Sequence, residues 1–392
     1  MSPSFQMARR RALRLVALAS ALWLAACSEL PVGNPDGPRI NTGKPITVAL
    51  LVPAGSGQAG DEGLARSLEN AARLAMADLQ GVQIDLRVYR TAGNAQTAAN
   101  VAVEAVNDGA KIILGPVYAA AANAAGTAVA ARGVNVLSFS NNTDIAGGNV
   151  FVLGHTFENT ASRLVGYATS QGKRNFTIAF GRDTAERKGR DAIVASLARA
   201  GLTPAGETSY ELSQNGVVQA VEEVTATAKS ANADAIFMTS GTAGALPILS
   251  QLIIENGVDR ETTQLIGLQR WDIPPGAREL PGLQGGWFAL PSPALTAQFE
   301  DRYTQAYGEP PHPIAALAYD GIAAIGALAS SGNADALTVA ALTQPTGFAG
   351  VNGVFRLNAD GTNQRGLAIA TIIDRQVSVI DPAPRSFGGA GL

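Results

Sequence analysis

Residues 46–79 read ITVALLVPAGSGQAGDEGLARSLENAARLAMADL. The apolar run 46–52 predicts a β-strand that is buried on both faces. A glycine-rich loop follows, and the apolar residues of 62–79 then recur at the spacing of an amphipathic helix. A strand, a loop and a helix in this order form the repeating unit of an α/β fold with a parallel sheet.

The same alternation continues along the chain. Apolar runs predict further strands at 83–89, 111–115, 134–140, 176–180, 234–240 and 264–269, and helical patterns include 95–109 and 189–201. Glycine stands where several helices should end, at positions 109, 172, 201 and 257. These patterns predict doubly wound parallel sheets with helices on both faces.

The alternation is interrupted three times, which predicts two lobes. A short strand at 151–154 follows a glycine-rich loop with no crossover helix before it, the pattern breaks again near Trp287, and it breaks a third time near Thr346. We therefore predict a first lobe of residues 45–155 plus 291–345. We predict a second lobe of residues 156–290 plus 346–380, with the three chain crossings as the hinge.

The N-terminus predicts export. Arginines precede the apolar stretch 15–26, which is too short for a permanent membrane span and is typical of a signal peptide. It ends in LAAC, which resembles the bacterial lipoprotein box and implies lipidation of Cys27, the only cysteine. Because Ser28 follows instead of aspartate, the resemblance favours a periplasmic protein anchored to the outer membrane. Residues 27–44 are predicted to be a polar tether and 381–392 a disordered tail.

Composition argues against several classes of function. Net charge is −3 and no basic run occurs beyond the first residues, so we expect no nucleic-acid partner. Only two histidines occur, and the chain lacks the common catalytic and metal-binding motifs. We therefore expect no enzyme activity, no metal and no cofactor.

The glycine loop 55–60 raises the possibility of a dinucleotide site. Asp61 and Glu62 occupy the first turn of the following helix, where they favour the helix dipole and would repel a phosphate. No acid stands at the end of the second strand, where the ribose of a dinucleotide would need one. A nucleotide ligand is therefore not expected.

Ligands of parallel sheets bind beyond the carboxyl ends of the strands, so polar residues there are candidate cleft contacts. Capping of the following helix is the alternative role for each of them. Backbone N–H groups near Ser140 and Ala119 would suit a carboxylate. The candidates in the first lobe are Ser56, Gln58, Tyr118, Ala119, Ser138, Ser140, Asn141 and Asn142; those in the second are Asp183, Lys188, Ser240, Thr242, Arg270 and Trp271.

Three segments carry a resemblance to the type I periplasmic binding proteins of the leucine/isoleucine/valine type: residues 46–79, 111–142 and 316–328. The resemblance implies binding of a small solute, an amino acid or a related anion, in the interlobe cleft and delivery to an inner-membrane ABC transporter. Residues 150–180 look most like the lipoprotein activators of penicillin-binding proteins, which implies the alternative of a non-catalytic activator of peptidoglycan synthesis.

The family's usual ammonium contacts are not found at the matching positions. Lys188 precedes Gly189 where the family has tyrosine, and the loop 239–245, TSGTAGA, has neither an aromatic residue nor an acid. An ammonium would meet cations there, so an anionic ligand or no small ligand is favoured. The alternative is that Arg187 and Lys188 merely begin an exposed helix.

Overall fold

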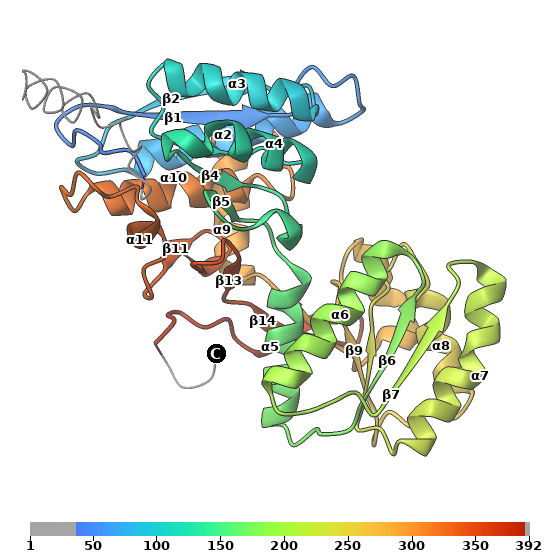
Figure 1. Cartoon of the computed structure of the whole chain (residues 1–392). Helices are drawn as coiled ribbons and strands as arrows, with labels where there is room; N and C mark the ends of the chain where they lie inside the picture. Colours follow the sequence, from blue (N-terminus) through green and yellow to red (C-terminus); the bar gives the residue numbers. More distant parts are fainter. Residues whose placement is uncertain (1–36, 389–392) are drawn as a thin grey trace, which may run out of the picture.

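The computed structural model describes residues 37–388 and contains two α/β lobes joined by three passages of the chain (Figure 1). The predicted signal peptide, Cys27 and the last four residues lie outside the described part. The predicted strands are present, and the predicted two-lobed fold class is confirmed.

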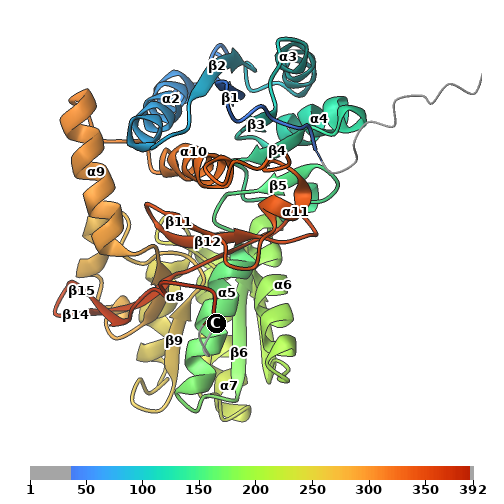
Figure 2. The ribbon, with the colours of Figure 1, turned by 90° about the vertical axis from the view of Figure 1, so that its left-hand side faces the viewer.

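The first lobe is built on a parallel sheet with the strand order β2-β1-β3-β4-β5. Its central strands are apolar because helices cover both faces. Helices α2 and α10 contribute to one core cluster and α3 and α4 to another. Figure 2 shows the sheet edge-on between these helix pairs. The strands are β1 (Ile46–Val52), β2 (Ile84–Arg90), β3 (Ile112–Leu114), β4 (Asn135–Ser138) and β5 (Val150–Val152), and the helices are α2 (Asp61–Asp78), α3 (Ala95–Asn107), α4 (Ala119–Val129), α10 (Ala316–Ala329) and α11 (Val339–Leu342).

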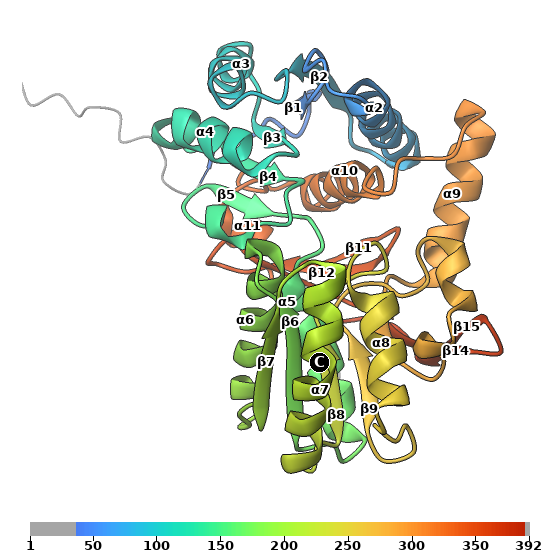
Figure 3. The same cartoon turned by 90° about the vertical axis from the view of Figure 1, so that its right-hand side faces the viewer.

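The second lobe is built on a sheet with the order β15-β14-β10-β9-β8-β6-β7. Helices α5 and α6 cover one face and α7 and α8 the other, as Figure 3 shows from the side. The strands are β6 (Phe176–Gly181), β7 (Gly206–Tyr210), β8 (Ala235–Met238), β9 (Gln264–Gly267), β10 (Trp287–Leu290), β14 (Ala368–Ile373) and β15 (Gln376–Asp381), and the helices are α5 (Phe157–Ser170), α6 (Thr184–Arg199), α7 (Gln214–Ser230) and α8 (Leu246–Glu255).

This second sheet differs from the predicted wholly parallel one. β14 runs antiparallel to β10, and β15 runs antiparallel to β14. Strand β7 was not predicted, because its sequence GETSY is polar: the strand lies at the sheet edge and is only half-buried. An edge strand lacks the continuous apolar run that reveals the central strands.

Helix termini follow the expected chemistry. Gly109, Gly172, Gly201 and Gly257 all adopt positive φ immediately after a helix, so the predicted glycine terminations are confirmed. At the other ends, Thr156 and Ser213 accept hydrogen bonds from the backbone N–H groups of α5 and α7.

A small antiparallel sheet lies between the lobes (Figure 2). It consists of β11 (Phe348–Gly350), β12 (Gly353–Leu357) and β13 (Asn363–Arg365). The chain leaves the first lobe after β5, leaves the second after β10 to enter α9 (Pro293–Tyr307), and re-enters the second at β14. Between β4 and β5 there is a single 3-10 turn, as expected from the absence of a crossover-helix pattern.

Two predicted terminal segments are partly attached to the body. Ile40 is buried in the core of the first lobe, and its N–H donates to the carbonyl of Ala334, so the predicted tether does not extend to residue 44. Asp381 ends β15, and the ring of Phe387 lies 4.8 Å from the guanidinium of Arg356. Disorder predicted from residue 381 therefore does not describe residues 381–388.

Candidate functional site

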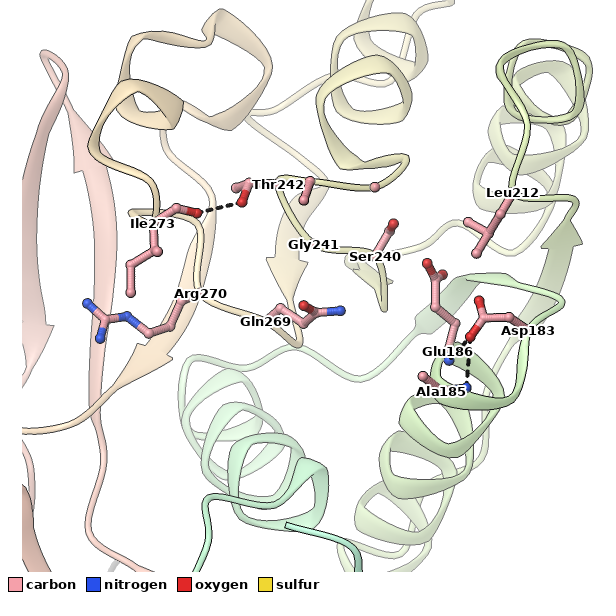
Figure 4. Close-up of a pocket in the computed structure, with 12 residues that line it drawn as sticks. Asp183, Ala185, Glu186, Leu212, Ser240, Gly241, Thr242, Gln269, Arg270 and Ile273 are labelled. Carbon is pink, nitrogen blue, oxygen red and sulfur yellow. Dashed lines mark hydrogen bonds between the residues drawn. The ribbon is translucent and has the colours of Figure 1, made fainter. Parts of the chain in front are cut away.

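A pocket of about 540 Å³ lies at the carboxyl ends of the strands of the second lobe (Figure 4). The loops after β6, β7, β8 and β9 surround it, which is the position expected for a ligand site of a parallel sheet. Residues from the second lobe alone line it: Asp183, Ala185, Glu186, Leu212, Ser240, Gly241, Thr242, Ala243, Gly244, Gln269, Arg270 and Ile273.

Asp183 caps helix α6 at one end of this pocket. Its Oδ1 accepts hydrogen bonds from the N–H groups of Ala185, at 2.7 Å, and Glu186, at 3.1 Å. Its Oδ2 is buried and has no hydrogen-bond partner among the described residues. Asp183 is therefore both the predicted helix cap and a lining residue with one unused acceptor.

Glu186 stands beside Asp183 and was missed in the sequence analysis. Its side chain is nearly buried, and Oε2 accepts bonds from the N–H of Gly181 at 2.6 Å, the hydroxyl of Thr239 at 2.8 Å and the hydroxyl of Tyr210 at 3.1 Å. The available signal was its position three residues after the cap, where an acid typically turns back towards the helix start. Burial and the neighbouring Glu186 raise the pKa of Tyr210, so this tyrosine remains a hydrogen-bond donor.

Arg270 lies at the opposite end of the pocket from the two acids (Figure 4). Its guanidinium donates to both oxygens of Asp272, at 2.9 and 2.5 Å. This bidentate pair neutralises the charge of Arg270 and fixes its orientation.

Ser240 and Thr242, both predicted contacts, line the pocket but already have local partners. Ser240 is buried, and its Oγ accepts from the N–H of Ala245 at 2.8 Å. The hydroxyl of Thr242 donates to the carbonyl of Ile273 at 2.5 Å. Both side chains shape the loop walls.

Trp271 does not lie in the pocket, contrary to the prediction. Its side chain is fully buried, stacks on Phe288 with ring centroids 6.4 Å apart, and occupies space left free by Gly267 and Gly286. The strand β9 ends at Gly267, so the chain has turned back into the core by residue 271. Trp271 therefore supports the wall from behind.

In the first lobe, Ser56 and Tyr118 meet at Asp61. Both hydroxyls donate to this buried carboxylate at 2.6 Å, and the N–H of Gln58 donates to Ser56 Oγ at 3.0 Å. The hydrogen bond to Asp61, together with burial, raises the pKa of Tyr118 to about 12. None of these residues lines the pocket, and neither does Ala119, which begins α4.

The glycine loop is closed by its own acids. Glu62 accepts a hydrogen bond from the N–H of Gly55 at 2.7 Å and pairs with Arg90 at 3.4 Å. Together with Asp61, Glu62 places negative charge at the start of α2, where a phosphate would have to bind.

The predicted residues 138–142 form a chain of local hydrogen bonds. Ser138 Oγ donates to the carbonyl of Pro116 and accepts from the N–H of Ser140, and Ser140 Oγ accepts from the N–H of Asn142. The N–H of Ser140 is therefore already used, contrary to the expectation that it is free for a carboxylate. Neither Asn141 nor the other residues of this turn line the pocket.

Lys188 links the two lobes and does not line the pocket. Its ammonium donates to Asn142 Oδ1 at 3.2 Å and forms an ion pair with Asp144, both in the first lobe. The cation that the sequence analysis places near a ligand ammonium is therefore engaged at the junction between β4 and α6.

The chain crossings share a buried polar cluster centred on Arg365. Its guanidinium donates to the carbonyl of Leu153, at 2.5 and 3.0 Å, and to Asp320 Oδ2 at 3.1 Å, with both charged side chains nearly inaccessible. Burial raises the pKa of Asp320, and Arg365 opposes this effect. The nearby His155 is partly buried, and burial together with the charges of Arg365 and Arg270 lowers its pKa to about 3.

Comparison with known proteins decides the family. A family model described as periplasmic binding protein matches residues 45–376. The chain belongs to this family. The search of curated proteins found no match.

Solved structures share the fold of this periplasmic binding protein. A putative branched-chain amino acid ABC transporter protein from Rhodospirillum rubrum aligns with a TM-score of 0.73 and 17% identity, covering 86% of this chain and 100% of that one. A substrate-binding protein from Desulfitobacterium hafniense in complex with Leu aligns with a TM-score of 0.61 and 19% identity, covering 86% of this chain and 100% of that one. A solute-binding protein from Rhodopseudomonas palustris in complex with 3,4-dihydroxy benzoic acid aligns with a TM-score of 0.56 and 18% identity, covering 86% of this chain and 96% of that one.

Two further properties concern residues 37–388 of this periplasmic binding protein. No helix in this part is both long and apolar enough to cross a bilayer. The same residues contain no group of three or more His, Cys, Asp and Glu side chains that could hold a metal ion.

Proposed function

We propose that this protein is a non-catalytic receptor for a small organic solute, which it delivers to an ABC transporter of the inner membrane. The observation that carries the proposal is the pocket at the carboxyl ends of β6, β8 and β9, in a chain that belongs to the periplasmic binding protein family. Amino acids are the first class to test, because one structural relative holds leucine.

The ligand completes its site when the lobes close. The pocket is lined by the second lobe alone, whereas the polar loops at residues 56–58 and 138–142 belong to the first. A ligand that contacts both sets of loops stabilises the closed form by the difference between its affinities for the two forms. We propose that the residues within each predicted lobe move together as a unit when the lobes close.

Calorimetry and thermal unfolding with amino acids and small organic acids test the receptor function. A ligand at about 100 times its Kd adds about 2.7 kcal/mol to the free energy of unfolding. The substitution Ala243→Trp fills the pocket and should abolish the effect. Ala198→Trp, at an exposed site on α6 outside the pocket, is the matched control and should leave the effect unchanged.

We further propose that Cys27 carries a lipid anchor and that Ser28 directs the protein to the outer membrane. Both residues lie outside the described part, and the support is the lipoprotein-like sequence. Cys27→Ser should release the protein from the membrane fraction, and Ser28→Asp should move it to the inner membrane. Retention of the Cys27→Ser protein in the membrane fraction would argue against the anchor.

Activation of a penicillin-binding protein is the second candidate. It is supported by the sequence resemblance of residues 150–180 and by the pocket itself, whose lining contains no aromatic side chain. If this function is correct, no small molecule in the ligand screen binds. The protein instead binds a peptidoglycan synthase and changes the rate at which the synthase makes peptidoglycan. A bound solute without any effect on the synthase favours the receptor function.

A further inference from the structure

Two carboxylates share one end of the pocket and have no cationic partner. Neither Asp183 nor Glu186 forms an ion pair with any residue of 37–388. Three cations near these carboxylates are paired elsewhere: Arg182 with Glu211, Lys188 with Asp144 and Arg270 with Asp272. The adjacent Arg187 is exposed, forms no ion pair among residues 37–388 and does not line the pocket. At this end of the pocket, therefore, no described cation neutralises the two carboxylates by direct contact.

Each of these carboxylates has an oxygen that accepts no hydrogen bond from a described residue. Helix capping uses Asp183 Oδ1 and leaves the buried Oδ2 unpartnered. Three donors converge on Glu186 Oε2, whereas Oε1 receives no hydrogen bond from a described residue. A buried acceptor without a donor costs about 1–3 kcal/mol, which a ligand N–H group can recover.

The apolar residues of the pocket lining indicate the chemistry of the remainder of the ligand. Leu212 and Ile273 line the pocket with side chains about half exposed, at 50% and 51%. An aliphatic body placed between them would remove their apolar surface from water.

We propose that the pocket binds a protonated amine or guanidinium at Asp183 and Glu186, with an aliphatic body against Leu212 and Ile273. This inference rests on the proposed receptor function and assigns its ligand class. It differs from the sequence-based interpretation, in which Arg187 and Lys188 favour an anion. Lys188 is instead held by Asp144, away from the pocket lining.

A matched set of probes separates the charges. Leucinamide keeps the amine of leucine without a carboxylate, and 4-methylpentanoate keeps the carboxylate without the amine. Lysine and putrescine extend the cationic set, and 3,4-dihydroxybenzoate extends the anionic one. Calorimetry on the full chain should show binding of at least one amine-bearing probe and no measurable binding of the two anions.

Substitutions that remove one charge locate the amine. Asp183→Asn retains the capping acceptor, and Glu186→Gln retains an acceptor for Gly181, so both variants keep the local hydrogen bonds. Each substitution should weaken binding of the amine-bearing probe at least tenfold, which corresponds to about 1.4 kcal/mol of binding free energy. Glu211→Gln makes the same charge change at an exposed residue outside the lining and should change affinity less than twofold.

The outcomes distinguish this inference from the receptor function on which it rests. Tighter binding of either anion, or unchanged amine affinity in both pocket variants, overturns the cationic ligand class and leaves a solute receptor. A flat response to every probe overturns the receptor function and the ligand class together.

Discussion

The polar residues at the strand ends are used differently in the two lobes. In the first lobe, Asp61 accepts from both Ser56 and Tyr118, and the turn 138–142 is a closed series of hydrogen bonds. In the second lobe, Asp183 and Glu186 retain oxygens without donors beside a pocket. Similar residue types at equivalent ends of parallel strands thus stabilise loops in one lobe and leave hydrogen-bond acceptors without donors in the other.

The largest expected effect comes from the crossings that join the two lobes. Arg365→Met leaves Asp320 buried without its partner, and we expect the free energy of unfolding to fall by about 3–5 kcal/mol, measured in urea. The double variant Arg365→Met with Asp320→Asn removes both charges and should recover part of this loss. Equal stability of the single and double variants would show that the ion pair does not secure the crossings.

The comparison of strand ends is tested most directly at Asp61. Asp61→Ala removes the acceptor of two hydroxyls, so we expect a loss of about 2 kcal/mol in the free energy of unfolding. Ligand affinity should fall less than in Glu186→Gln, because Asp61 holds the loop 56–58 but does not line the pocket. Glu186→Gln should show the reverse, with a large loss of affinity and a small loss of stability. If Asp61→Ala impaired binding as strongly as Glu186→Gln, the proposed division between the lobes would be wrong.

His155 provides a test of the chain crossings through pH. The folded state keeps this histidine neutral, since its pKa is lowered to about 3, whereas the unfolded chain binds a proton near pH 6.5. Between these values the unfolded state binds more protons, so acidification removes stability, by at most about 1.4 kcal/mol per pH unit. The contribution of His155 is fully present above about pH 6.5 and is lost as the pH falls towards 3.

The measurement compares unfolding of the native chain with that of His155→Gln between pH 7 and 4. Relative to the variant, the native chain should become less stable as the pH falls. Parallel stability curves would mean that the imidazole is not shielded from protonation.

The smallest effect is expected at the contact between the lobes outside the pocket. Lys188 and Asp144 are both substantially exposed, at 42% and 67%, so Lys188→Gln should lower the free energy of unfolding by less than about 1 kcal/mol. Lys188→Arg retains the charge and is the matched control. A loss above 2 kcal/mol in Lys188→Gln, measured in urea, would show that this exposed pair is a principal link between the lobes.

The sequence determined the α/β alternation, the interruptions of the pattern and the helix ends. Central parallel strands are buried on both faces, and a left-handed helix terminus selects glycine, so these features follow from local physical chemistry. Residues such as Gly109 and Thr156 therefore report their structural roles directly.

Only the tertiary structure decided which polar residues remain available. Ser56 and Asp183 both follow strands, yet the first is satisfied by Asp61 and the second keeps a free oxygen beside Glu186. Trp271 follows a strand as well but turns into the core. Such partners come from loops distant in sequence, and hydrogen-bond satisfaction depends on atoms within about 3.5 Å rather than on residue type, so no local pattern could specify it.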